Sequence, residues 1–201
     1  FPKTADVPAI FVDHPMAFNT LHYADYDGLT TEEDMGQVMA IAMQGHLHAV
    51  QFDMVWPYAS LLARVKSDSR QKVKTVLQIG EKALDHCRND PAKVCQYLQS
   101  YGRGLVDYVL LDKSMGKGKG MDAAFLLPFI RAIADTFPGL GIAEAGGLGP
   151  TTMHLAEPVI QEFPWTSIDA QSKLRPSGNA LDPIDWKMAS TYLKKASELF
   201  P

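Results

Sequence analysis

The stretch Leu105–Pro150 reads LVDYVLLDKSMGKGKGMDAAFLLPFIRAIADTFPGLGIAEAGGLGP, and it decides the fold class. A short apolar run ends on Asp112, a glycine-lysine loop follows, and the apolar spacing predicts an amphipathic helix over 123–136. A second apolar run, Leu140–Ala145, ends at another glycine pair. Strand, loop, helix and strand in this order indicate a parallel βαβ unit. Because parallel α/β folds bind ligands at the carboxyl ends of their strands, we look for function in these loops.

The rest of the chain repeats this alternation. Further apolar runs predict strands at 8–14, 20–23, 48–53, 72–79 and 165–170. Further helices are predicted at about 31–43, 57–65, 92–101, 151–162 and 184–199. Strands that are each followed by a helix favour a (βα)8 TIM barrel over an open doubly wound sheet. A barrel whose first βα unit is incomplete or missing is the variant left open. No linker or break in composition interrupts residues 1–201, so we expect a single domain.

Composition excludes several classes of protein. The net charge of −4 argues against a nucleic-acid partner, and no apolar run approaches the roughly 20 residues of a membrane span. Two cysteines, Cys87 and Cys95, are typical of a reducing cytoplasm, and their spacing matches no metal motif. We therefore expect a cytoplasmic protein without a metal or cofactor. The chain begins at Phe1 rather than Met, which suggests a processed or truncated piece.

Polar residues end most of the predicted strands. In a barrel such side chains converge on one mouth, where acid-base chemistry needs two or three groups around one bound molecule. The alternative is that polar residues occur there because loops begin there, where their side chains cap the next helix or bond to loop amides. The residues concerned are His22, Asp53, Gln78, Asp112, Glu144 and Asp169.

Two glycine loops fit an anion. Gly116, Gly118 and Gly120 alternate with lysines, and Gly146–Gly147 precede a predicted helix start. Glycines let backbone N–H groups approach a phosphate closely, and lysines supply charge. One such loop alone is often a flexible turn, but two on consecutive βα units favour a phosphorylated small-molecule ligand.

At these residues the sequence resembles phosphoribosylanthranilate isomerase, a (βα)8 barrel. The similarity covers about residues 48–200 in order. VQFD resembles the family's VQLHG strand, YVLLDKSMGKGKGMD its LLDT…GGTGKTFDW segment, AEAGGLGP its LAGGLNPENV, SIDAQS its VDVSSG, and LDP its KDP.

The resemblance implies site residues and a reaction. Asp112 matches the family's general acid in an Amadori aldose-to-ketose isomerisation. The family's phosphate contacts map onto Gly118, Gly146, Gly147 and Ser172, and Gly116 lies in the same loop. The family's catalytic cysteine on the first strand and its carboxylate-binding arginine have no counterpart here. Asp53 replaces a histidine of the VQLHG strand.

These departures leave three functional readings. The first is a divergent isomerase acting on a phosphorylated, sugar-derived substrate, in which Asp53, Glu144 or Asp169 replaces the missing base. Such a base needs a pKa raised by burial or by a neighbouring carboxylate. The second is a non-catalytic barrel that binds a phosphorylated ligand. The third is another reaction on the same scaffold, such as that of an epimerase or a lyase. We expect a monomer or a homodimer.

Overall fold

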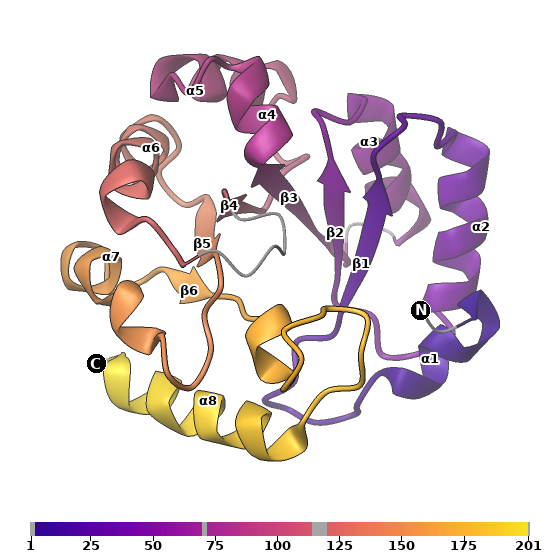
Figure 1. Cartoon of the computed structure of the whole chain (residues 1–201). Coiled ribbons are helices and arrows are strands. Elements are labelled where there is room, and N and C mark those ends of the chain that lie inside the picture. The colour runs from indigo at the N-terminus through magenta and orange to yellow at the C-terminus, as the bar shows by residue number, and fades with distance from the viewer. Residues whose placement is uncertain (1–2, 70–71, 114–119, 201) are drawn as a thin grey trace. The chain divides into compact units, whose positions relative to one another are not determined.

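The computed structural model describes residues 3–69, 72–113 and 120–200. The chain has an α/β fold with a parallel six-stranded sheet, and its strands follow one another in chain order, β1-β2-β3-β4-β5-β6 (Figure 1). By its contacts the chain divides into two compact units. Unit one holds residues 1–79 and 96–109, and unit two holds residues 80–95 and 110–201.

Unit one contains the first three strands and their helices. In order, its elements are the 3-10 helix η1 (Thr4–Asp6), α1 (Val7–Ile10), β1 (Thr20–Asp25), α2 (Glu32–Ala42), β2 (Ala49–Met54), α3 (Ala59–Asp68) and β3 (Lys74–Gly80), whose last residue belongs to unit two. Strands β1, β2 and β3 pair in parallel. The fully buried side chains of Met35, Met39, Phe52 and Leu62 fill the core between sheet and helices.

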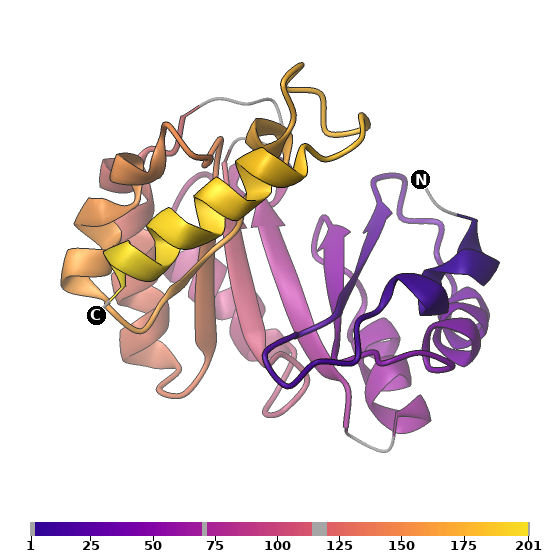
Figure 2. The ribbon, with the colours of Figure 1, turned by 90° about the horizontal axis from the view of Figure 1, so that it is seen from below.

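Unit two contains the rest of the alternation. Its elements are α4 (Glu81–His86), α6 (Ala123–Thr136), β5 (Gly141–Ala145), the 3-10 helix η2 (Met153–Leu155), α7 (Glu157–Glu162), β6 (Ser167–Ile168), the 3-10 helix η3 (Ser172–Leu174) and α8 (Trp186–Leu199). The chain crosses between the units within α5 (Pro91–Ser100) and β4 (Tyr108–Asp112). Strands β5 and β6 pair in parallel, and α8 packs against η2 and η3 (Figure 2).

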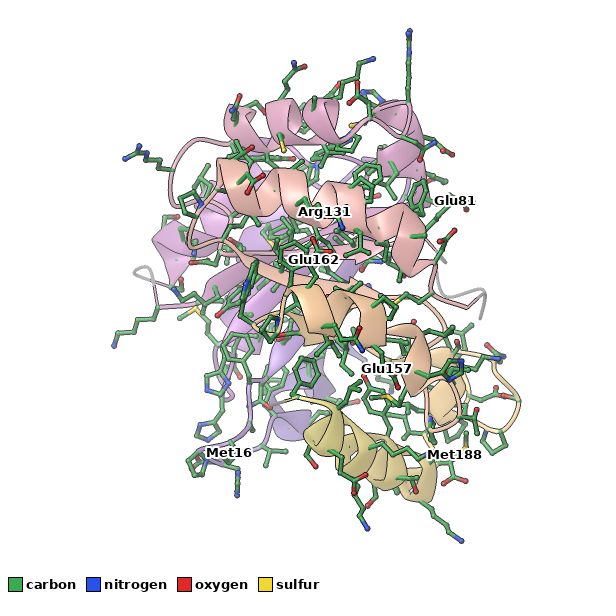
Figure 3. All side chains as sticks on the ribbon, turned by 90° about the vertical axis from the view of Figure 1, so that its left-hand side faces the viewer. Met16, Glu81, Arg131, Glu157, Glu162 and Met188 are labelled. Atoms are coloured by element: carbon green, nitrogen blue, oxygen red, sulfur yellow. The ribbon has the colours of Figure 1, made fainter. Side chains whose placement is uncertain are left out.

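Helices α6 and α7 of unit two are joined by a bidentate ion pair at the surface. The Arg131 guanidinium donates to both carboxylate oxygens of Glu162 at 2.5 and 2.6 Å (Figure 3). The apolar stripe of α6, which includes Phe129, Ile130 and Ile133, is buried on the other side of the helix. The predicted helix over 123–136 is confirmed at both ends, and Asp122 caps it by accepting from the N–H of Phe125.

The predicted strand at 8–14 is wrong. Val7–Ile10 form a helical turn with Pro8 among its first residues, a position that suits proline because its missing N–H needs no partner there. The side chains of Ile10 and Val12 are more than half exposed, so this apolar run has no core to face. The sequence also did not predict the short helix α4 between β3 and α5.

Strand order distinguishes between the two sheet types that the alternation allows. A doubly wound sheet reverses its order at a switch point, whereas the order here rises steadily from β1 to β6. A steadily rising order has no switch point, and it is the order that the barrel prediction requires. The described residues form six strands, so the eight-unit closed barrel goes beyond what the structure shows.

Candidate functional site

Buried acidic residues stand at the strand ends of unit two. Asp112 is the last residue of β4 and is 7% exposed, and Glu144 near the end of β5 is completely buried. Asp169 directly follows β6, and its backbone N–H donates to the Glu144 carbonyl oxygen at 2.9 Å. The side chain of Asp169 is exposed. Two of the predicted strand-end acids are thus held inside this unit, and the third stands beside them at its surface.

The loops that follow these three strands pack against one another. A Cβ atom added to Gly146 would lie 3.2 Å from the Cα atom of Met121, which precedes α6. One added to Gly149 would lie 2.5 Å from the Cβ atom of Lys173 in η3. Described residues of the loops after β4 and β6 therefore each contact the loop after β5, in line with the expectation for the carboxyl ends of parallel strands.

The Gly146–Gly147 loop has a backbone conformation that favours glycine. Gly146 has φ = 140° and Gly147 has φ = 58°, both in the range that L side chains rarely adopt. The Thr152 hydroxyl donates to the Gly147 carbonyl oxygen at 2.8 Å and fixes the loop ahead of η2. Ser172, the first residue of η3, is also buried. These three predicted phosphate ligands thus belong to the same group of loops.

The other predicted phosphate ligands, Gly116 and Gly118, lie outside the described residues. Lys113, which precedes them, is described. Its ammonium group stands 3.4 Å from the centre of the Phe125 ring, so it makes a cation–π contact with α6.

The pKa of Glu144 departs strongly from that of a surface acid. Burial raises its pKa to about 8, and the hydrogen bond with Thr166 opposes this shift only in part. One carboxyl oxygen, Oε1, lies 3.2 Å from the Thr166 hydroxyl oxygen, while Oε2 has no partner among the described residues. Glu144 therefore has the raised pKa that a replacement for the missing base needs.

Tyr192 was not predicted from the sequence, because a tyrosine inside an amphipathic helix looks like core packing. The side chain is 7% exposed, and its hydroxyl has no hydrogen-bond partner among the described residues. Burial raises the pKa of this phenol above its usual range, and the negative charges of Asp169 and Glu144 add to that effect. The phenol therefore lies in the same acidic environment as the strand ends. Nearby on α8, the Lys195 ammonium donates to the Pro150 carbonyl oxygen at 2.5 Å.

Asp53 lies in unit one and has a different environment. His22 Nε2 lies 3.3 Å from Asp53 Oδ2, and the Tyr26 hydroxyl donates to the same oxygen at 2.5 Å. Burial acts to raise the pKa of Asp53, but these two hydrogen bonds and the charge of His22 together lower it below its ordinary value. Asp53 is therefore ionised at neutral pH and does not meet the requirement for a base with a raised pKa.

A pocket of about 420 Å³ opens in unit one between the loops that follow β1 and β2. Its walls include Tyr26, Trp56 and Tyr58. Trp56 has φ = 50° and stacks on Tyr97 with 4.7 Å between ring centres, whereas Tyr58 is 76% exposed.

Gln78, another predicted strand-end residue, accepts from the side-chain amide of Gln51 at 2.7 Å.

Comparison with known proteins agrees with the fold and shows no family. No family model matches the chain, and no curated protein matches it. A crystal structure of phosphonopyruvate hydrolase is similar over 89% of this chain and 69% of that one, with 12% identity and a TM-score of 0.52. PhdJ bound to a substrate intermediate is similar over 70% of this chain at 11% identity and a TM-score of 0.43. The chain spans about half the length of PhdJ, at 49%.

The likeness to phosphonopyruvate hydrolase is a likeness to a fold of the TIM-barrel type. At 12% identity this likeness shows the fold alone. The resemblance of the sequence to phosphoribosylanthranilate isomerase is not tested by either structure. None of the helices in the described ranges has the length and apolar character needed to cross a bilayer.

Proposed function

We propose that this chain is a divergent barrel enzyme that binds a phosphorylated, sugar-derived small molecule at the strand ends of unit two. Two observations carry the proposal: residues of the loops after β4, β5 and β6 pack against one another, and the acids at the ends of β4 and β5, Asp112 and Glu144, are buried. In barrels of this winding, ligands bind at that end of the strands.

The phosphate group is assigned to the loop after β5 and to η3. In this proposal the ligands are the backbone N–H groups of Gly146 and Gly147, which have no side chain in the way, and the hydroxyl of Ser172. Gly116 and Gly118 stay in the proposal as sequence predictions. The resemblance to the isomerase family supports the same assignment through its AGGL-x-P motif.

Proton transfer is assigned to two carboxyl groups. Asp112 is the general acid that the family resemblance implies, and it stands buried at the end of β4. Glu144 replaces the missing cysteine as the second group. Its pKa of about 8 suits transfer near neutral pH, because a catalytic group works best when its pKa is close to the working pH. An aldose-to-ketose isomerisation needs such a pair, one group to remove a proton from carbon and one to protonate oxygen. Asp169 remains a third candidate at the mouth of the same site.

The name of one neighbour supports an anionic substrate. Phosphonopyruvate carries a phosphonate group, which resembles a phosphate monoester in charge and shape, and the hydrolase that bears its name has a similar fold. Phosphonates therefore belong in the panel of ligands beside sugar phosphates.

A thermal-shift titration tests the binding step. Inorganic phosphate, ribose 5-phosphate, glycerol 3-phosphate and phosphonopyruvate are compared with ribose and glycerol. At a hundred times the dissociation constant a ligand stabilises the fold by about 2.7 kcal/mol, which is a melting shift of roughly 5–10 °C for a chain of this size. We expect shifts with the phosphorylated ligands only.

Two matched variants locate the site. Gly147→Asp places a carboxylate in the phosphate loop and should abolish the shift. Gly102→Asp is the control, because Gly102 has a similar backbone conformation, with φ = 73°, and open space around it. No shift with any phosphorylated ligand, or equal loss in both variants, argues against the proposal.

The second candidate is a barrel that binds the ligand without turning it over. It is favoured by the absence of the family's cysteine and arginine and by the lowered pKa of Asp53. Turnover of the best-bound ligand separates the two candidates. An enzyme loses turnover and keeps binding in Asp112→Asn, whereas a binding protein has no turnover to lose.

A further inference from the structure

Two buried polar atoms of unit two lack a hydrogen-bond partner. Within the described ranges, Glu144 Oε2 and the Tyr192 hydroxyl are the buried side-chain atoms left in this state. Their residues are 0% and 7% exposed. Folded proteins pair nearly all buried polar groups, because an unpaired one costs about 1–3 kcal/mol. Two such atoms in one unit therefore call for a functional explanation.

The two atoms belong to one environment. Glu144 lies on β5, and Tyr192 lies on α8, which packs against η2 and η3, the elements that follow β5 and β6. The negative charges of Glu144 and Asp169 also help to raise the pKa of the Tyr192 phenol. The carboxyl group and the phenol therefore interact electrostatically, and α8 packs against the elements that follow the loops assigned to the phosphate group.

Tyr192 offers a hydrogen-bond donor and Glu144 offers an acceptor, but the two groups do not bond to each other. A phenol donates a hydrogen bond through its O–H, and a carboxyl oxygen accepts one. The two groups make no hydrogen bond with each other. A group that accepts from Tyr192 and donates to Glu144 satisfies both, and an alcohol hydroxyl is the common ligand group that does so.

We infer that Glu144 and Tyr192 form a subsite for a hydroxyl group of the phosphorylated ligand. This inference rests on the proposed function and deepens it. The substrate class becomes a phosphate ester that carries a free alcohol beside the phosphate-bearing part, such as a sugar or polyol phosphate. Simple alkyl phosphates lack the alcohol and leave both protein groups unpaired.

The experiment compares two ligands that differ only in their alcohols. Glycerol 3-phosphate carries two hydroxyl groups, and n-propyl phosphate carries none on the same three-carbon frame. Dissociation constants are measured by isothermal titration calorimetry. We expect the wild-type protein to bind glycerol 3-phosphate roughly 5- to 30-fold more tightly, the range that one or two buried hydrogen bonds provide.

Three variants separate the subsite from the phosphate loop. Tyr192→Phe and Glu144→Leu should each bring the two dissociation constants together, while the constant for n-propyl phosphate stays within about twofold. Tyr108→Phe is the matched control, because Tyr108 is partly exposed at the start of β4 and packs its ring against Phe18. It should keep the full preference for glycerol 3-phosphate. A melting curve of each variant confirms that it is folded.

The outcomes are distinguishable from a failure of the proposed function. If the wild-type protein binds both phosphates equally, or if Tyr192→Phe keeps the preference, the hydroxyl subsite is wrong and the phosphate site stands. If the wild-type protein binds neither ligand nor inorganic phosphate, the proposed function fails and the subsite fails with it.

Discussion

The hydroxyl oxygen of Thr166 lies 3.2 Å from Oε1 of Glu144. It also lies 3.0 Å from the Phe163 carbonyl oxygen. A hydroxyl carries one hydrogen, so Thr166 cannot donate fully to both acceptors. A protonated Glu144 resolves this, because its O–H donates to Thr166 while Thr166 donates to Phe163. The geometry thus agrees with the pKa of about 8 that burial gives to Glu144.

A protonated Glu144 makes the stability of the protein depend on pH. Between its ordinary pKa of 4.5 and the folded value of about 8, the folded state holds a proton that the unfolded state lacks. The free energy of unfolding therefore falls as pH rises through this window, by roughly 1 kcal/mol per pH unit from this group. Urea unfolding at pH 5, 6, 7 and 8 measures the slope. In Glu144→Gln the slope should become smaller, and an unchanged slope contradicts a protonated Glu144.

Tyr192→Phe should make the protein more stable. The substitution removes a buried hydroxyl that has no partner and keeps the aromatic ring. We expect the free energy of unfolding to rise by about 1 kcal/mol, since an unpaired buried donor costs about 1–3 kcal/mol. Urea unfolding checks this, with Tyr101→Phe as the control. Tyr101 donates to the Pro57 carbonyl oxygen at 2.8 Å, so its loss should destabilise. Destabilisation by Tyr192→Phe means that the hydroxyl is structural.

Gly149→Ala should loosen the packing between the loops after β5 and β6. Its Cβ would stand 2.5 Å from the Cβ of Lys173 and 3.0 Å from the Lys173 carbonyl oxygen, so backbone must move. We expect a loss of about 1–3 kcal/mol and weaker phosphate binding. Gly120→Ala is the milder comparison, because its Cβ meets only the end of the Leu155 side chain at 3.2 Å. Equal effects in chemical unfolding rule out a special role for the Gly149 contact.

Tyr26→Phe should raise the pKa of Asp53. The variant removes a 2.5 Å hydrogen bond that stabilises the ionised carboxylate, and burial, which acts in the opposite direction, remains. Carbon-13 NMR of the Asp53 carboxyl group through a pH titration measures the change. Tyr23→Phe is the control, because the Tyr23 hydroxyl pairs with Thr30 instead. If the Asp53 pKa does not rise, then Tyr26 does not hold the carboxylate in its charged form.

The sequence predicts the fold well wherever the apolar period and the end signals agree. The helix over 123–136 has both a strong apolar stripe and a capping aspartate, and the structure places it there. The run at 8–14 has the apolar residues of a strand, but Pro8 and its exposed neighbours belong to a helical turn. A run of a few apolar residues cannot distinguish a strand from a turn of helix, because each is too short to show its period.

The sequence predicts which strand ends and loops of unit two come together, and it predicts less of their chemistry. Strand-end acids and the Gly146–Gly147 loop can be read from the sequence because parallel strands bring their ends together. The opposite pKa shifts of Asp53 and Glu144 cannot be read, because they depend on which partners reach each carboxylate. Tyr192 leaves no signal in the sequence, since its role depends on burial beside charges from distant strands.

A crystal structure with glycerol 3-phosphate tests the central claim most directly. The account predicts the phosphate group within hydrogen-bonding distance of the backbone N–H of Gly147 and the hydroxyl of Ser172. It also predicts one alcohol between Glu144 and Tyr192. A phosphate group bound elsewhere, or no ligand bound at saturating concentration, contradicts the account.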